Sequence, residues 1–458
     1  MTTISHVPIP TSSPDLPPVE RQAALPAGFK AGGLAAGIKA SGRPDLAVIA
    51  TTNGPAAAAA VFTPNRLAAA PVRLSRAHLA ATSGDARGAF GWAEAIISTS
   101  GSANAATGPL GDADQLAIGR LLAGATGAPL ERTLHLSTGI IGTRLPLDRV
   151  ASGLEALAPR LTEADDGLQA AAGALRTTDS VTKVATTRVI LPGADGEPVT
   201  VTVSGIAKGV GMIHPQMATM LSVLLTDAAA PPETLWSLLR PAAARTWNQL
   251  SVDGDTSTND TVFLLASGAS GAAPIEPGST AATVLGTAIQ AVARNLARQQ
   301  AADGEGASTL ITTVVSGARD DADARAVARA VVSSSLVKAA AHGRDPNWGR
   351  IAGAAGNGTL PSAAVLEAAG LDPGEAAARA GTPAVVDPSS LRIHIADYLV
   401  FDGAVDGPVD FDRVAARGAM DAPEVVLSLD LGLGAGVGEA FGCDLTEKYV
   451  IENSEYTT

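Results

Sequence analysis

The chain has 458 residues, and its 32 Lys and Arg against 45 Asp and Glu give a formal net charge of −13. An acidic protein of this kind is a poor partner for nucleic acid or for an anionic membrane. Its single cysteine, Cys443, excludes an intramolecular disulfide framework and a metal site built only from cysteines.

The N-terminal 26 residues are rich in Pro and Ser and poor in large apolar residues, so we expect a mobile tail over 1–26. No apolar run precedes the first basic residue, Arg21, so no secretory signal peptide is predicted. The longest apolar stretch, residues 46–62, is interrupted by TTNGP and falls short of the roughly 18–20 apolar residues of a membrane helix. The sequence therefore predicts a soluble, cytoplasmic protein.

Strand-like and helix-like apolar patterns then follow each other irregularly. In chain order, we expect a strand at 46–50, a helix at 114–122, a strand at 134–141, helices at 150–161 and 168–175, a hairpin of 184–192 and 199–206 around PGADGEP, a strand at 220–225, helices at 280–300 and about 320–333, and a strand in VVLSLDLGLG. Hydrophobic residues make up 46% of the chain and aromatic residues 3%, so the core should consist of Ala, Val, Leu and Ile. Without strict βαβ alternation, the pattern favours an α+β fold, or a layered sandwich of sheets covered by helices.

Two segments resemble ligand-binding loops only superficially. In GLGAGVG at 432–438 the glycines alternate, which gives no G-x-G-x-x-G frame, so close backbone packing is favoured over a dinucleotide site. DGDTSTND at 253–260 begins with the ligand spacing of a calcium loop but lacks the glycine and the final glutamate that such a loop needs. A hydrogen-bonded turn is favoured there, and no metal site is predicted.

The histidines and the cysteine give weak signals. The six histidines form no i, i+4 pair of the zinc type. His214 lies five residues before Thr219, which leaves open a histidine-assisted nucleophile beside the simpler interpretation of a local polar contact. Cys443 is interpreted as a small buried residue rather than a nucleophile.

The most informative segment is AKGVGMIHPQMATMLSVLLTDA at 207–228, a Gly-rich loop that runs into a buried strand with Ala218-Thr219 at the junction. If the chain were cut before Thr219, the new α-amino group would lie beside its own hydroxyl. Because such an amine has an ordinary pKa of about 7.7–8.0, it can act as a base near neutrality. This is the threonine variant of nucleophilic catalysis. A threonine that merely begins a strand is the alternative.

The motif K-G-x-G-M-I-x-P-x-M-A-T-M-L at 208–221 resembles the self-cleavage motif of the ornithine acetyltransferase family of arginine biosynthesis. Further segments resemble the family in the same order, from about residue 27 to the C-terminus: GFKAGGLAAGIK (28–39), LSTGIIG (136–142), TTDS (177–180), VDGDTSTNDTV (252–262), DGEGA (303–307), DPNWGRIAGAAG (345–356) and CDLTEKYVIENSEYTT (443–458).

The resemblance implies self-cleavage between Ala218 and Thr219. It implies an alpha chain of residues 27–218 and a beta chain of residues 219–458 that begins with the nucleophile. The two chains would form an αββα sandwich of the N-terminal-nucleophile type with a smaller C-terminal α/β portion, and would assemble as a heterotetramer or larger.

The resemblance also implies a glutamate N-acetyltransferase that moves an acetyl group from N2-acetylornithine to glutamate through an acetyl ester on Thr219, without a cofactor. Thr138 and Gly139 match the family's oxyanion-stabilising pair. The family's substrate-contact positions correspond to Thr177, Lys208, Thr219, Glu305, Asn453 and Thr458. Acetyl-CoA as a further donor is left open.

Two other functions remain at this stage. One is an N-terminal-nucleophile amidohydrolase or aminopeptidase of related fold, in which water replaces glutamate as the acceptor. The other is a binding protein that uses the scaffold without catalysis. The appearance of N-acetylglutamate when glutamate is supplied would separate the transferase from the first, and two fragments on a denaturing gel would separate it from the second.

Overall fold

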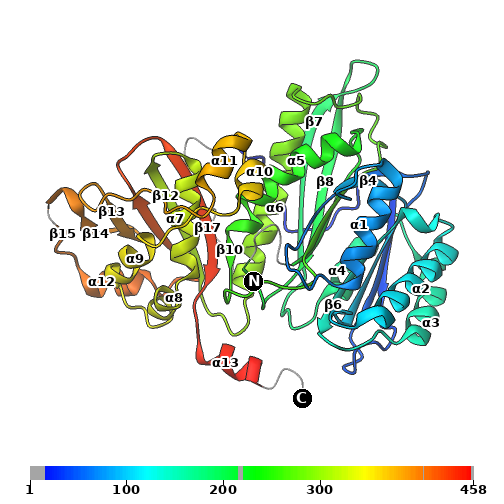
Figure 1. Ribbon diagram of the computed structural model, residues 1–458, viewed down its shortest axis with the longest axis horizontal. Helices are drawn as coiled ribbons and strands as arrows, with labels where there is room; N and C mark the ends of the chain where they lie inside the picture. The colour runs from blue at the N-terminus through cyan, green and yellow to red at the C-terminus, as the bar shows by residue number, and fades with distance from the viewer. Residues whose placement is uncertain (1–15, 215–219, 406, 455–458) are drawn as a thin grey trace.

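The computed structural model describes residues 16–214, 220–405 and 407–454. Two β-sheets face each other on the right of Figure 1, and a third sheet occupies its left side. The first of the facing sheets has the order β1 (Phe29–Leu34), β2 (Leu46–Thr51), β5 (Ala95–Ser102), β6 (Thr133–Ile140). The second has the order β4 (Phe90–Ala93), β3 (Ala56–Phe62), β11 (Thr261–Ala266), β9 (Leu221–Thr226), β8 (Pro198–Lys208), β7 (Lys183–Pro192). Within these two sheets only the pairs β5–β6 and β9–β11 are parallel.

Small apolar side chains fill the space between the facing sheets. Strand β3 has the sequence AAAAAVF and is buried at every position. Ala56, Ala58 and Ala60 pack together with side chains such as Ile49 of β2 and Leu225 of β9 in one apolar cluster, whereas Ala57 and Ala59 belong to the cluster on the other face of the sheet. The low aromatic content of the chain thus corresponds to a core in which short side chains let the layers approach closely.

Helices cover the outer faces of both sheets. Helices α2 (Gly108–Thr126) and α3 (Leu147–Leu157) pack on the four-stranded sheet, and α5 (Pro232–Arg245) and α6 (Thr280–Ala302) pack on the six-stranded sheet. Helices α1 (Ala70–Ser83) and α4 (Asp165–Leu175) contribute to the cluster between the sheets. The predicted αββα sandwich is confirmed.

The third sheet forms the predicted C-terminal α/β portion. It has the order β10 (Leu250–Ser251), β17 (Gly436–Cys443), β12 (Leu310–Ala318), β16 (Glu424–Asp430), β13 (Arg392–Ile395), β14 (Tyr398–Asp402), β15 (Gly407–Pro408). Helices α7 (Asp321–Ser333), α8 (Ser335–His342) and α9 (Trp348–Ala355) share its apolar core. The remaining helices are α10 (Ala363–Ala368), α11 (Pro373–Arg379), α12 (Arg413–Ala419) and α13 (Glu447–Ser454).

Helix α6 connects the sandwich to this portion. Ser279 is the N-cap residue of α6. Its hydroxyl oxygen accepts a hydrogen bond from the Ala282 N–H, a backbone donor that has no partner within the helix. Two of its arginines form buried ion pairs with the third sheet, Arg294 with Glu439 at 2.5 Å and Arg298 with Glu424 at 2.8 Å. The helix is rich in alanine and buried along most of its length, as a helix with sheets on two sides requires.

Several sequence predictions are confirmed with small differences in bounds. The hairpin around PGADGEP is β7–β8, with Pro192 paired to Pro198. The predicted helix at 150–161 is shorter, because α3 ends at Leu157 and a 3-10 turn at Ala158–Arg160 contains Pro159, which cannot continue an α-helix ladder. The glycines at 432–438 pack against backbone as predicted: a Cβ on Gly436 would lie 2.1 Å from the Asp320 carbonyl carbon.

Part of the predicted N-terminal tail lies against the sandwich. Glu20 exchanges backbone hydrogen bonds with Thr186 of β7, and the Thr187 hydroxyl donates to the Pro18 carbonyl. Ala23 and Ala24 are buried. Contacts between the N-terminal segment and the sandwich therefore begin at Pro18, before the predicted boundary at residue 26.

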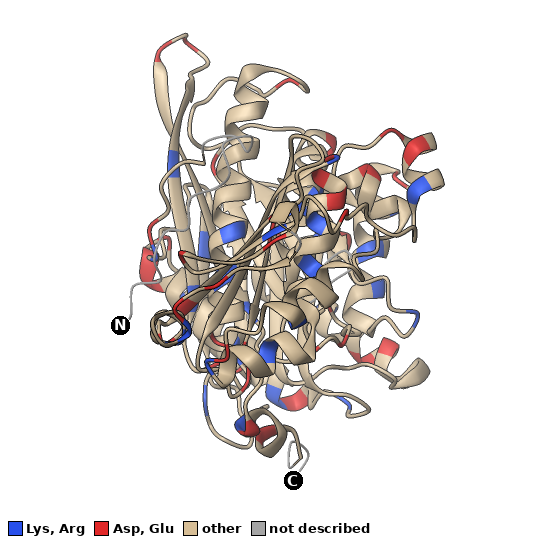
Figure 2. Cartoon of the chain, turned by 90° about the vertical axis from the view of Figure 1, so that its left-hand side faces the viewer, with Lys and Arg blue, Asp and Glu red and all other residues tan. Residues whose placement is uncertain are grey.

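In the part of the chain that the structure describes, every helix is too short or too polar to cross a bilayer. Basic and acidic residues are interspersed over the molecule in Figure 2.

Candidate active site

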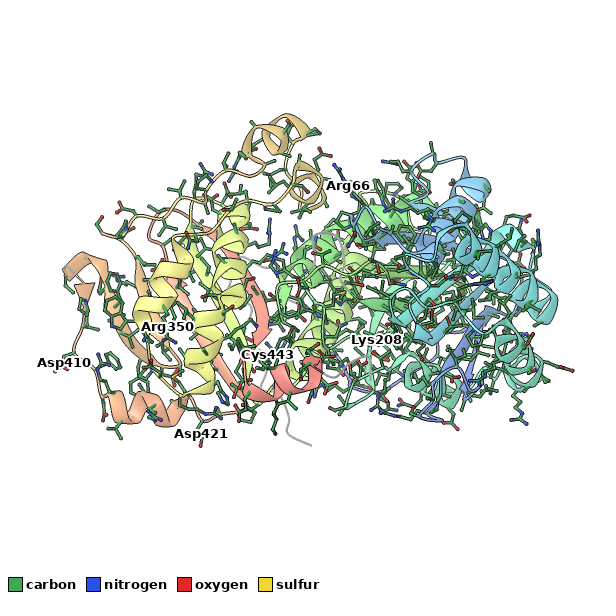
Figure 3. All side chains as sticks on the ribbon, turned by 60° about the horizontal axis from the view of Figure 1, so that its bottom comes forward. Arg66, Lys208, Arg350, Asp410, Asp421 and Cys443 are labelled. Atoms are coloured by element: carbon green, nitrogen blue, oxygen red, sulfur yellow. The ribbon has the colours of Figure 1, made fainter. Side chains whose placement is uncertain are left out.

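A cavity of about 380 Å³ lies where the ends of β6 and β8 meet the beginning of β9. Lys208, the last residue of β8, is paired with Leu221, the first residue of β9. The turn at 303–306 and helix α13 contribute to the cavity from the C-terminal side. Segments far apart in the sequence therefore meet at one end of the sandwich, near Lys208 in Figure 3.

Six of the predicted site residues line this cavity: Thr138, Gly139, Thr177, Lys208, Glu305 and Asn453. Ala218, Thr219 and Thr458 lie outside the described residues. The described residues on either side of the predicted cleavage site, Ile213 and Met220, line the same cavity. The structure thus brings together every described residue that the sequence assigned to the site.

The predicted oxyanion pair lies at the end of β6, where two strands approach unusually closely. Gly139 has φ of +127°, and a Cβ there would be 2.4 Å from the carbonyl carbon of Gly101 in β5, so only glycine fits. The hydroxyl of the neighbouring Thr138 accepts a hydrogen bond of 3.3 Å from Lys208 Nζ. This hydroxyl and the adjoining backbone are fixed beside a buried cation.

A buried charge network supports Lys208. Asp179 accepts hydrogen bonds from Lys183 Nζ at 2.7 Å, Gly209 N at 2.8 Å and Thr177 N at 3.0 Å. Burial alone would raise the pKa of Asp179, but Lys183 and Lys208 hold it below its usual range, so the carboxylate is ionised. Burial lowers the pKa of Lys208, and Asp179 opposes this effect. Lys183 Nζ also forms an ion pair with Asp303 Oδ2 at 2.5 Å.

Glu305 joins the C-terminal helix to the cavity. Its two carboxylate oxygens accept hydrogen bonds from the Thr178 hydroxyl and from Asn453 Nδ2, each at 2.9 Å. Gly211 lies directly opposite it, and a Cβ there would come within 2.2 Å of Glu305 Oε2 and displace the carboxylate. The cavity therefore presents a cation and a carboxylate to the same small volume, which suits a ligand of amino-acid size that carries both charges.

Sequence reasoning missed Asp260 as a candidate. It lines the cavity and is buried, and its Oδ2 has no hydrogen-bond partner among the described residues. Burial raises its pKa well above the ordinary value, which favours the neutral acid. The residue ends the DGDTSTND segment, which was interpreted only as a turn. The next residue back, Asn259, donates to the Ser137 carbonyl and so ties this loop to β6.

The simpler interpretations of the other segments agree with the structure. Asp253 accepts backbone hydrogen bonds from Ile213 and Asp255, as expected of a turn, and no group of acidic, His or Cys side chains in the described residues could hold a metal. His214 Nδ1 contacts Ser251 Oγ at 3.1 Å, and its side chain does not line the cavity. Cys443 is a buried free thiol whose pKa burial raises.

Comparisons with known proteins identify the family of this chain. The family model described as the ArgJ family matches residues 30–458. The arginine biosynthesis bifunctional protein ArgJ of Thermosynechococcus vestitus is 44% identical over 94% of this chain and 96% of its own length, and that of Thermus thermophilus is 42% identical over 95% and 99%. A solved ornithine acetyltransferase from Mycobacterium tuberculosis, complexed with ornithine, is 37% identical over 44% of this chain and 99% of its own, with a TM-score of 0.38. Because the family model and the two ArgJ proteins from Thermosynechococcus vestitus and Thermus thermophilus span nearly the whole chain, the protein belongs to the ArgJ family.

Proposed function

We propose that the protein is a glutamate N-acetyltransferase that transfers acetyl from N2-acetylornithine to glutamate. It is an acyltransferase of arginine biosynthesis: its full-length relatives are named for arginine biosynthesis, and the solved relative is named an ornithine acetyltransferase. The observation that carries the substrate assignment is the shared cavity of Lys208 and Glu305. Lys208 can pair with the α-carboxylate that both substrates carry, and Glu305 with the side-chain ammonium of ornithine.

In this proposal Thr219 is the nucleophile. Its hydroxyl oxygen attacks the acetyl carbonyl of N2-acetylornithine, the carbon–nitrogen bond breaks, and ornithine leaves with the proton. The α-amine of glutamate then attacks the acetyl ester, and N-acetylglutamate leaves while the Thr219 hydroxyl is restored. Thr138 and Gly139 stabilise the oxyanion in both steps. The position of Ile213 and Met220 on the cavity wall supports this role for the segment between them.

The nucleophile is freed by cleavage of the chain itself. The Thr219 hydroxyl attacks the Ala218 carbonyl, an N-to-O acyl shift forms an ester, and water resolves it into chains 1–218 and 219–458. The new α-amine is the base for transfer. The two chains would stay together, because β9 and β11 of the second chain pair with β8 and β3 of the first within one sheet.

The remaining parts of the proposal concern assembly and donors. The cleaved pair assembles as a heterotetramer or larger in the cytoplasm, and acetyl-CoA serves as a further acetyl donor, in keeping with the name "bifunctional" of the relatives. The C-terminal Thr458 completes the substrate pocket. The contact between Asn453 and Glu305 supports this, since it places the last described helix at the cavity. Light scattering of the purified protein, and assays with acetyl-CoA and with a chain shortened by Thr457 and Thr458, test these parts.

One experiment tests the central proposal. Purified protein is given N2-acetylornithine labelled in the acetyl group, with and without glutamate, and products are identified by mass spectrometry. We expect labelled N-acetylglutamate only with glutamate, an acetyl group on the 219–458 chain without it, and Thr219 as a second N-terminus. Thr219→Ala should stay uncut and inactive, whereas Thr283→Ala, at an exposed position of α6, should behave as wild type. Release of acetate without N-acetylglutamate would contradict the proposal and favour an amidohydrolase.

A further inference from the structure

A second cavity, of about 290 Å³, lies beside helix α7. Its wall comes from one face of α7, from the segment 357–369 that includes α10, and from His214 and Gln249. None of its described lining residues is acidic, and it shares no lining residue with the active-site cavity in the part of the chain that the structure describes. It is therefore a separate space with its own chemistry.

The wall of this cavity contains an arginine, Arg329, that forms no ion pair with any described residue. Arg329 of α7 has two guanidinium nitrogens, Nε and Nη2, that are buried and have no hydrogen-bond partner among the described residues. Burial lowers the pKa of Arg329 to about 10, and no described carboxylate opposes the effect. Arg329 as a whole is partly exposed, but two of its charged nitrogens are buried without an acceptor among the described residues, which is costly unless an anion is bound there.

Arg325 adds a second cation to the wall of this cavity. Arg325 lies one helical turn before Arg329 and is buried, and the nearest carboxylate, the half-exposed Asp321, lies 3.8 Å from Arg325 Nη1. His214 also lines the cavity, and its pKa is lowered to about 4, first by burial and then by the positive charges of Arg329 and Lys338, so the imidazole is neutral near pH 7. Two cations therefore face a volume whose described walls offer no negative charge.

We propose that this cavity binds a small organic carboxylate. The two guanidinium groups match the planar oxygen pair of a carboxylate. The rest of the wall includes the apolar side chains of Leu360, Val365 and Leu366. These suit a short hydrocarbon group attached to the carboxylate better than inorganic phosphate, which has no apolar part.

Adjacent residues of one loop line the two cavities. Ile213 lines the active-site cavity, and the next residue, His214, lines the second cavity. Both belong to the loop that leads to the predicted cleavage site. A carboxylate beside Arg329 would thus lie against the same loop that shapes the wall of the catalytic cavity.

Thermal melting of the purified full-length protein tests the site without using acetyl transfer, so its result is independent of the proposed function. The probes are isovalerate, its uncharged analogue isovaleramide, and inorganic phosphate, each at constant ionic strength and neutral pH. We expect isovalerate to raise the melting temperature saturably and isovaleramide to leave it unchanged. In Arg329→Met the apparent affinity for isovalerate should fall about tenfold or more.

Matched variants separate binding from folding. Arg120→Met removes an exposed arginine of α2 and should respond as wild type. Arg329→Lys, which keeps the charge but loses the planar fork, should bind with intermediate affinity. Without any probe, Arg329→Met should melt no lower than wild type, because an uncompensated buried charge is removed.

Three results would overturn the proposal. They are no saturable response of wild type to isovalerate, an equal response of Arg329→Met, and a lower melting temperature of Arg329→Met without a probe. A response to phosphate alone would overturn the assignment to a carboxylate.

Discussion

The two cavities differ in how their buried cations are compensated. In the active-site cavity, Lys208 lies close to the ionised Asp179. The fully buried Lys183 is paired with Asp179 and Asp303. In the second cavity, Arg325 and Arg329 face walls in which no described residue is acidic. A desolvated charge is costly unless it is paired. The first site therefore supplies its own counter-ions. In the second, Arg325 has the half-exposed Asp321 at 3.8 Å, and Arg329 Nε and Nη2 have no partner among the described residues, which is the basis of the anion site proposed above.

The largest expected effect comes from removing a compensated cation. Lys183 is fully buried between two carboxylates, so Lys183→Met would leave Asp179 and Asp303 without their shared partner. We expect the free energy of unfolding to fall by about 3–5 kcal/mol. Urea unfolding measures it, with Arg66→Met as the control because Arg66 is exposed. Arg329→Met, by contrast, should not lower the free energy of unfolding. If Lys183→Met lowers it by less than about 1 kcal/mol, the proposed difference between the two cavities is wrong.

The next effect concerns the hydroxyl that contacts Lys208. Thr138→Ala should lower turnover by about 10²–10³-fold and slow self-cleavage in parallel, because one oxyanion donor is lost. Steady-state kinetics and the time course of cleavage on denaturing gels measure the two rates. Thr138→Ser, which keeps the hydroxyl, should retain most of both. Normal cleavage with normal turnover in Thr138→Ala would show that this hydroxyl is not an oxyanion donor.

A smaller effect is expected at the carboxylate of the active-site cavity. Glu305→Gln keeps the shape and the hydrogen-bonding oxygen toward Thr178 but removes the charge. The KM for N2-acetylornithine should rise by roughly tenfold or more, since a charge-assisted hydrogen bond contributes about 1.5–3 kcal/mol. The KM for glutamate, which lacks a side-chain ammonium, should change less. An equal rise for both substrates would place Glu305 in a general structural role.

Stability should also depend on pH through a buried basic group that needs no counter-ion because it stays neutral. His135 is fully buried between Gln115 and Thr133, and burial together with His78 lowers its pKa to about 3. Between pH 6.5 and about 3 the unfolded chain binds a proton at this position and the folded chain does not. Stability is therefore complete above pH 6.5 and is lost as pH falls through this window, by at most about 1.4 kcal/mol per pH unit.

Urea unfolding at pH 7, 6 and 5 tests this prediction. The free energy of unfolding of His135→Gln should fall less steeply with decreasing pH than that of wild type. An identical slope in the two proteins would show that His135 is protonated in the folded state or does not titrate independently.

Much of the fold follows from local patterns in the sequence. PGADGEP between two β-rich runs determines the hairpin β7–β8, because turn residues and strand propensity agree there. The alternating glycines at 432–438 determine close packing against the start of α7. The Gly-rich segment at 207–228 predicts a buried strand at 220–225, and β9 is observed at Leu221–Thr226, although Ala218 and Thr219 lie outside the described residues.

Tertiary structure alone decided which charges are buried and with what they pair. Asp260 ends a segment that has the pattern of an ordinary turn, and Arg325 and Arg329 have the i, i+4 spacing of a solvent-exposed helix face. Their burial depends on segments far away in the sequence, the strand ends around the active-site cavity and residues 357–369 over α7. The free energy of a charged side chain depends on the water and the partners that distant segments leave to it, and a local sequence pattern does not contain that information.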